Sequence, residues 1–263
     1  MAITALHSAS TGLSALSTQI DVVSNNLANV NTTGFKASRV NFEDLLYQQK
    51  GQPGVENANG NERPAGLLVG HGVRISNTQF DFSQGDAVPT EVPLDVSIDG
   101  PGFFQVRIVQ DFGDGIGYTR AGNFFLNSER QVVLGNADGP LLEPPVQIPD
   151  DIGEDQISIS ADGRIFAIRP GEEPEQIEQI TLANFANPAG LETIGGNIFV
   201  PTAASGPAID GLLPGEATVG TLIQGFLEGS NVDPVKELVT LIKTQRAFEM
   251  NSQTIQAADE TLQ

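Results

Sequence analysis

The chain has 263 residues, a formal net charge of −20 at pH 7 and no cysteine. The lack of cysteine excludes disulfides, thiol catalysis and cysteine-ligated metals. The negative charge argues against a nucleic-acid partner, because neutralising phosphates requires lysine and arginine.

Composition and charge divide the chain into a middle and two ends. The 29 glycines and 16 prolines, with only 6% aromatic residues, are typical of a protein with many short strands and turns. Residues 75–230 contain 23 of the 33 acidic and 5 of the 13 basic residues, a net charge of −18. The nearly neutral ends are free to pack closely, whereas like charge repels copies of the middle.

The N-terminal segment predicts a long helix over residues 3–29. Apolar residues recur every seven positions in two rows, the heptad pattern of a helix that pairs with other helices. The first row is Leu6, Leu13, Ile20 and Leu27, and the second is Ala9, Leu16, Val23 and Val30. Residues 1–20 contain no lysine or arginine, so we expect no cleaved signal peptide.

The segment after this helix predicts a stop, an apolar cluster and a loop. Asn29–Gly34 favours a turn, because Asn and Thr side chains compete for backbone hydrogen bonds and Gly34 can adopt a positive φ. The apolar cluster that follows is Phe35, Val40, Phe42, Leu45, Leu46 and Tyr47. Gln48–Gly66 lacks a buried pattern, and we expect a long exposed loop.

The middle of the chain, residues 67–224, predicts antiparallel strands and turns. Alternating apolar residues in PLDVSIDGPGFFQV indicate two strands separated by a turn, and ISISADGRIFAI indicates a hairpin around Asp162-Gly163. GYTRAGNFFLN and QITLANF fit further strands. Since strands do not alternate with helices, a parallel sheet is not expected.

The C-terminal segment predicts a second long helix over residues 234–262, with Asp233 as its cap and Pro234 in its first turn. An apolar heptad row is repeated here, beside a companion row that is mostly polar. The apolar row is Leu241, Phe248, Ile255 and Leu262, and the companion row is Leu238, Gln245, Ser252 and Asp259. Narrow seams on both helices favour packing against further copies over a role as two surface helices.

Catalytic and metal-binding patterns are weak. His7 and His71 are far apart in the sequence, with no third ligand type nearby. DFGDGIG and DDIGED are acidic turns that lack the alternating spacing of a calcium loop. Carboxylate pairs for glycoside hydrolysis meet only in space, so they remain open. We expect no catalytic residue, metal or cofactor.

At both ends and in the middle, the chain resembles bacterial flagellar axial proteins, the rod and hook subunits. The N-terminal signature of that family is similar to DVVSNNLANVNTTGFKASRVNFEDLLYQ, residues 21–48. Its closing segment, in which S-N-V precedes a helix with Q-R-A-[YF]-E-x-N, is similar to residues 227–263. PLDVSIDGPGFFQV and YTRAGNF also match, so the resemblance covers nearly the whole chain. FEDLLYQ followed by a loop with Gln52, Pro53 and Gly54 most resembles the distal rod members.

The resemblance implies a mainly β central domain and long terminal helices that pair as a coiled coil. It also implies three layers: terminal helices 1–30 and 232–263 lining an inner tube, a connecting layer 31–75 and 211–231 with exposed loop 48–66, and an outer β-rich domain 76–210. The seam residues of the tube would be Leu6, Leu13, Leu16, Ile20, Val23, Leu27, Leu241, Phe248, Ile255 and Leu262.

The function implied by the resemblance is that of a structural subunit, not an enzyme, which polymerises helically into the distal rod and transmits torque to the hook. Its partners would be copies of itself, proximal rod proteins, the hook protein, the periplasmic and outer-membrane rings, and the flagellar export apparatus. Nucleic acid and small-molecule substrates are not expected. The alternatives are a hook or proximal rod subunit, and a secreted β-rich carbohydrate-active enzyme, which would show an acidic pair in a deep cleft.

Overall fold

The computed structural model describes residues 2–54, 65–108, 115–135, 139–216 and 218–260. The chain folds into two compact units, each assembled from segments that are distant in the sequence. Unit 1 comprises Met1–Ala28, Ser38–Phe80 and Asp233–Gln263, and unit 2 comprises Asn29–Ala37 and Asp81–Val232.

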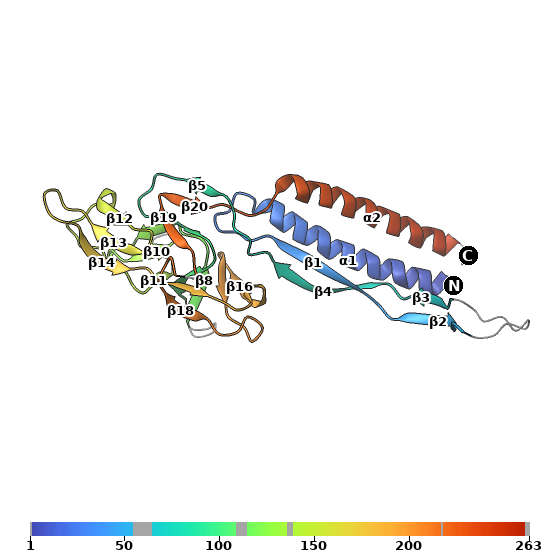
Figure 1. Cartoon of the computed structure of the whole chain (residues 1–263). Coiled ribbons are helices and arrows are strands. Elements are labelled where there is room, and N and C mark those ends of the chain that lie inside the picture. Colours follow the sequence, from blue (N-terminus) through green and yellow to red (C-terminus); the bar gives the residue numbers. More distant parts are fainter. Residues whose placement is uncertain (1, 55–64, 109–114, 136–138, 217, 261–263) are drawn as a thin grey trace, which may run out of the picture. The chain divides into compact units, whose positions relative to one another are not determined.

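Unit 1 contains the two long helices of the described chain, α1 (Ala2–Ala28) and α2 (Pro234–Glu260), each 27 residues long. The two helices lie side by side, and α1 also contacts strands β1 and β4 (Figure 1). The predicted terminal helices are therefore confirmed. Within the described ranges, neither helix is long and apolar enough to span a membrane.

The start of α2 follows from its sequence. Asp233 Oδ1 accepts hydrogen bonds from the backbone N–H groups of Val235 at 3.0 Å and Lys236 at 3.2 Å. These bonds satisfy two donors that a helix leaves unpaired at its N-terminus. The predicted cap is confirmed, and the same hydrogen bonds lower the pKa of the Asp233 carboxyl.

The strands of unit 1 form two antiparallel pairs, β1 with β4 and β2 with β3. Their bounds are β1 (Ser38–Asp44), β2 (Tyr47–Gly51), β3 (Leu67–Gly70) and β4 (Val73–Phe80). Residues 48–51 are therefore strand, where the sequence indicated loop. The side chains of this segment are polar on both faces of the strand. The sequence therefore lacks the alternation of apolar and polar residues by which a strand is recognised.

The apolar cluster predicted after Gly34 does not form a core. Leu46 is 87% exposed, and Phe42 and Tyr47 are also exposed. These three side chains remain exposed although α1 contacts β1 and β4, because a two-stranded ribbon supplies no further sheet to cover them. Among the described residues of unit 1, the only fully buried apolar side chains are Ala9, Ala15 and Val23.

Unit 2 is built from antiparallel strands, which confirms the expected absence of a parallel sheet in the described chain. Its largest sheet has nine strands, and β12, β13 and β14 form a separate three-stranded sheet. The strand bounds are β5 (Ala87–Pro89), β6 (Val96–Asp99), β7 (Phe103–Arg107), β8 (Ile116–Thr119), β9 (Phe124–Leu126), β10 (Val132–Leu134), β11 (Leu141–Glu143), β12 (Ile157–Ile159), β13 (Arg164–Ala167), β14 (Glu175–Gln179), β15 (Leu182–Asn184), β16 (Glu192–Gly195), β17 (Ile198–Val200), β18 (Ile209–Leu212), β19 (Thr221–Gln224) and β20 (Phe226–Glu228).

The core of unit 2 lies between these sheets. It contains aliphatic and aromatic side chains that are almost inaccessible to water, among them Ile98, Phe104 and Leu142. The hairpin predicted at Asp162-Gly163 joins β12 to β13 and is confirmed, with Gly163 at a φ of +85°. Unit 2 therefore has its own hydrophobic core.

Gly34 is the glycine on which the turn after α1 depends. Its φ is +69°, and a Cβ at this position would lie 2.6 Å from the backbone nitrogen of Ala121. The positive φ predicted for the turn is confirmed, and the close approach adds a second reason for glycine.

We therefore expect Gly34→Ala to destabilise unit 2. Gly171→Ala is the matched control, because Gly171 also has a positive φ, +89°, but a Cβ added there would have no atom within 4 Å. Gly34→Ala should lower the free energy of unfolding by roughly 1–3 kcal/mol more than the control, since it adds overpacking to backbone strain. Urea denaturation of both variants measures this difference, and equal losses would contradict it.

Candidate functional site

The predicted seam of α1 is only partly buried within the chain. Val23 is buried, whereas Leu6, Leu13, Leu16, Ile20 and Leu27 are half-buried. Gly12 lies against α2: a Cβ there would be 3.1 Å from Asn251 Nδ2. The glycine that weakens the helix in isolation thus allows the two helices to approach each other.

The seam of α2 differs from the predicted one in its second row. Leu241 and Ile255 are half-buried, Phe248 is 37% exposed, and Leu262 lies outside the described residues. The companion row that turns inward is Glu237, Thr244, Asn251 and Ala258, of which Thr244 is buried. In the predicted companion row, Leu238, Gln245 and Asp259 are exposed and Ser252 is half-buried. Two rows flank Leu241, and sequence periodicity alone does not decide which one meets α1.

An apolar stripe runs along the exposed side of α2. Val235, Leu238, Val239 and Ile242 are 68%, 45%, 45% and 51% exposed, and their spacing places them on one helix face. We refer to these four residues as the α2 stripe. Exposed apolar surface of this regularity marks an interaction site.

The β2–β3 hairpin is a second exposed apolar surface of unit 1. Tyr47, Leu67 and Leu68 on its strands are more than half exposed. Gln52, Pro53 and Gly54, the predicted rod-specific loop residues, continue from β2 and are exposed. Of the remaining loop, residues 55–64 lie outside the described residues.

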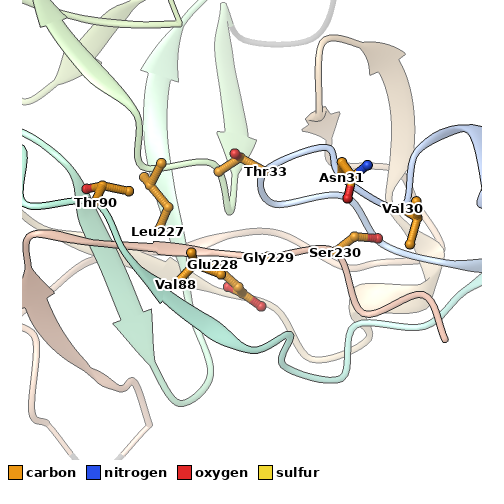
Figure 2. Close-up of a pocket in the computed structure, with 9 residues that line it drawn as sticks. All are labelled: Val30, Asn31, Thr33, Val88, Thr90, Leu227, Glu228, Gly229 and Ser230. Carbon is orange, nitrogen blue, oxygen red and sulfur yellow. The ribbon is translucent and has the colours of Figure 1, made fainter. Parts of the chain in front are cut away.

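Figure 2 shows a pocket of about 360 Å³ in unit 2. Its lining comes from the turn after α1, from β5 and from the end of β20: Val30, Asn31, Thr33, Val88, Thr90, Leu227, Glu228, Gly229 and Ser230. The one carboxylate in this lining, Glu228, already pairs with Lys36. The pocket therefore offers no free acid–base pair for catalysis.

A buried charge cluster lies beside this pocket. Glu228 Oε1 accepts a hydrogen bond from Lys36 Nζ at 2.5 Å, and its Oε2 accepts one from Arg120 Nη1 at 3.3 Å. The Lys36 and Glu228 side chains are 0% and 1% exposed. Burial lowers the pKa of Lys36 and of Arg120, while the Glu228 carboxylate opposes this shift. Removing one partner of such a pair costs about 3–5 kcal/mol, because a buried charge is left unpaired.

The two histidines meet, although nothing in the sequence pattern pairs them. His7 Nδ1 donates to the backbone carbonyl of His71 at 3.0 Å, which joins α1 to the turn between β3 and β4. In the part of the chain that the structure describes, no three His, Asp or Glu side chains are grouped to hold a metal. The first four residues of DFGDGIG fall outside that part. In DDIGED, Asp151 pairs with Arg169, which lowers the pKa of Asp151.

Sequence reasoning missed the α2 stripe and the charge cluster for different reasons. The stripe has a helical spacing that is visible in the sequence, but its Leu238 was assigned to the seam. Lys36 and Glu228 are 192 positions apart, and neither belongs to a recognisable sequence motif. A single sequence contains no signal that pairs them.

Comparison with known protein families gives three matches along the chain. The model for "Flagella basal body rod protein" matches residues 6–36, and that for "Flagellar hook protein FlgE/F/G D1 domain" matches residues 97–167. The model for "Flagellar basal body rod FlgEFG protein C-terminal" matches residues 223–263. The matches cover both terminal helices and part of unit 2.

Three curated relatives are similar over nearly their whole length, and all carry the name flagellar basal-body rod protein FlgG. The protein of Borreliella burgdorferi is 42% identical over 98% of this chain and 96% of its own. That of Caulobacter vibrioides is 42% identical over 98% and 97%. That of Buchnera aphidicola subsp. Schizaphis graminum is 44% identical over 96% and 95%. The chain therefore belongs to the family of flagellar basal-body rod proteins.

Proposed function

We propose that the chain polymerises helically into the distal rod, the part of the flagellar drive shaft that transmits torque from the motor to the hook. The family is a structural one, so the alternative of a carbohydrate-active enzyme is set aside. The relatives' names favour the rod over the hook. The observation that carries the proposal is the α2 stripe, an apolar surface that the chain itself leaves uncovered.

In this proposal the terminal helices of neighbouring copies cover one another. α1 and α2 pair as a coiled coil, line the inner tube through the seam residues, and bury the α2 stripe against other subunits. Residues 31–75 and 211–231 form the connecting layer, and residues 76–210 lie outside. Full burial of one Val, Leu or Ile side chain contributes about 1.5–3 kcal/mol, and about half of each of the four stripe side chains is still exposed, so together they contribute roughly 3–6 kcal/mol per subunit to assembly.

The remaining partners follow from the same proposal. A rod subunit meets proximal rod proteins at one end and the hook protein at the other, and the rings of the periplasm and outer membrane surround it. The chain would pass out of the cytoplasm through the flagellar export apparatus and become part of the rod that spans the periplasm. Electron microscopy of purified basal bodies with the chain labelled tests this: label confined to the rod supports the proposal, and label in the hook or absent from the basal body would refute it.

The loop between β2 and β3 provides a prediction about stiffness. Gly51 and Leu67 are partners in the β2–β3 register, so residues 52–66 can be replaced by an Asn-Gly turn that keeps both strands paired. We expect the shortened chain to polymerise into filaments that are more curved or more compliant, because this loop provides contacts between neighbours that keep a shaft straight.

The control shortens the exposed turn between β13 and β14 in unit 2 and should leave filament shape unchanged. Persistence length and curvature are measured from micrographs of both polymers. If filaments of the shortened-loop variant are as straight and stiff as those of the wild type, the loop has no role in filament stiffness.

A further inference from the structure

Within unit 2, the segments by which the chain passes to and from unit 1 are bound to one another. The chain passes between the units at four places: after Ala28, after Ala37, after Phe80 and after Val232. In unit 2 these passages involve three segments, which we name the entry segment (29–37, which contains the first two passages), the return segment (81–86) and the exit segment (228–232).

Glu228 connects all three segments. Its Oε1 accepts from Lys36 Nζ of the entry segment at 2.5 Å and from the Gly85 N–H of the return segment at 2.9 Å. Its backbone carbonyl accepts from the Gly34 N–H at 2.8 Å. Lys36 Nζ also donates to the Ser83 carbonyl at 2.7 Å, so the charged pair joins each segment to the other two.

Asn231 repeats this pattern closer to the exit. Its Oδ1 accepts from the Ala37 N–H at 2.7 Å, and its Nδ2 donates to the Asp81 carbonyl at 2.8 Å. The Asp81 N–H in turn donates to the Ala37 carbonyl at 2.8 Å. Entry, return and exit segments are thus joined by side chains as well as by backbone.

Each of these contacts is of a kind that fixes geometry. The charged pair is excluded from water. Hydrogen bonds between ionised groups are short and directional. A buried ion pair contributes little net stability compared with well-packed apolar residues, so stability alone does not account for this pair. Arg120 Nη1 bonds Glu228 Oε2 from the β8 side and ties the cluster to the large sheet.

We propose that Lys36, Glu228 and Asn231 form a mechanical clamp, which makes load that arrives along any one of the three segments act on all of them together. A force that pulls on one connection must then shear several hydrogen bonds at once. This inference rests on the proposed function, because a load along the connections arises in a rotating shaft. The family comparisons assign no role to these three residues.

The first test is hydrogen exchange on the purified full-length monomer, with Glu228→Gln as the variant. The substitution keeps the size of the side chain and removes the charge that pairs with Lys36. Exchange of the Gly34, Ala37 and Gly85 amides should rise by at least about tenfold more than exchange of the β7–β8 amides, because a local opening adds to the loss of global stability that all amides of unit 2 share. The control is Glu143→Gln, which breaks an exposed ion pair with Arg107 in the same unit and should change none of them.

A second variant, Asn231→Asp, tests the clamp independently in case Glu228→Gln misfolds. It keeps the Oδ1 acceptor for Ala37 and loses the donor to Asp81 and Ser83, at a position that is not fully buried. Exchange of the Asp81 amide should rise. If both variants leave the segment amides unchanged, or raise exchange equally throughout unit 2, the clamp is overturned and the residues are ordinary parts of the fold.

The last measurement addresses load. Filaments of Glu228→Gln should have a shorter persistence length than filaments of the wild type and of Glu143→Gln. Equal stiffness with locally raised exchange would overturn the load-sharing role. Failure of the wild-type chain to form any filament would instead refute the proposed function, while the exchange data would still decide whether the three segments are held together.

Discussion

Ile242→Asp should abolish polymerisation of the chain and leave unit 2 folded. Ile242 is half exposed in the isolated chain, so its replacement costs the monomer little. In the proposed polymer the exposed half of the side chain is covered by a neighbouring subunit, so each copy would lose half of the ~1.5–3 kcal/mol of a full burial. The carboxylate adds a larger desolvation cost when the neighbouring subunit covers it. The critical concentration for polymerisation and the presence of rods in basal bodies measure the effect.

Thr254→Asp is the matched control for this substitution. Thr254 is also exposed and also lies on α2. It is twelve positions further along, which at roughly 100° per residue places it about 120° around the helix from Ile242. The control should therefore polymerise close to the wild-type critical concentration. Assembly of the Ile242 variant at the same concentration as the control would show that the stripe is not an assembly surface.

Hydrogen exchange in a dilute monomer should be fast in both terminal helices and slow in unit 2. Among its described residues, unit 1 fully buries only Ala9, Ala15 and Val23 as apolar side chains. Ordering the backbone costs about 1–2 kcal/mol per residue, and burial of this small extent does not offset it for two helices of 27 residues. Neighbouring subunits supply the missing burial, so folding of the helices is coupled to assembly.

The expected protection is low over residues 1–30 and 235–263 and at least about a thousandfold higher between residues 90 and 210. Mass spectrometry of peptides from the monomer, followed by the same measurement on the polymer, gives both values. The helices should become protected only in the polymer. Strong protection of the ends in a verified monomer would contradict coupled folding.

The elements that the sequence predicted well are those with local causes. The start of α2 depends on one carboxylate two residues from the N–H it binds, and the β12–β13 hairpin depends on one Asp-Gly pair. Both helices followed from apolar periodicity. The β2 strand was missed because its side chains are exposed on a ribbon with no buried face, so its sequence lacks the alternation of apolar and polar residues that indicates a half-buried strand.

The candidate site was less predictable because it depends on which surfaces remain uncovered. Leu238 and Thr244 lie on either side of Leu241, and only packing against α1 decides that Thr244 is buried and Leu238 exposed. The Lys36–Glu228 pair needs the whole of unit 2 to bring its members together. Sequence periodicity therefore located the two terminal helices, but it did not identify which face of each helix stays exposed and available to another subunit.

The hydrogen bond between the Gly34 amide and the Glu228 carbonyl places the beginning and the end of unit 2 next to each other. Changes in the exposed loops between β5 and β20 that keep Arg120 and Ala121 in place thus leave the separation of these two ends unchanged. The outer surface of unit 2 can therefore diverge in size and charge while the distance between the points where the chain enters and leaves it stays the same. The same geometry makes it the natural place to insert a fluorescent or affinity domain without disturbing the helices.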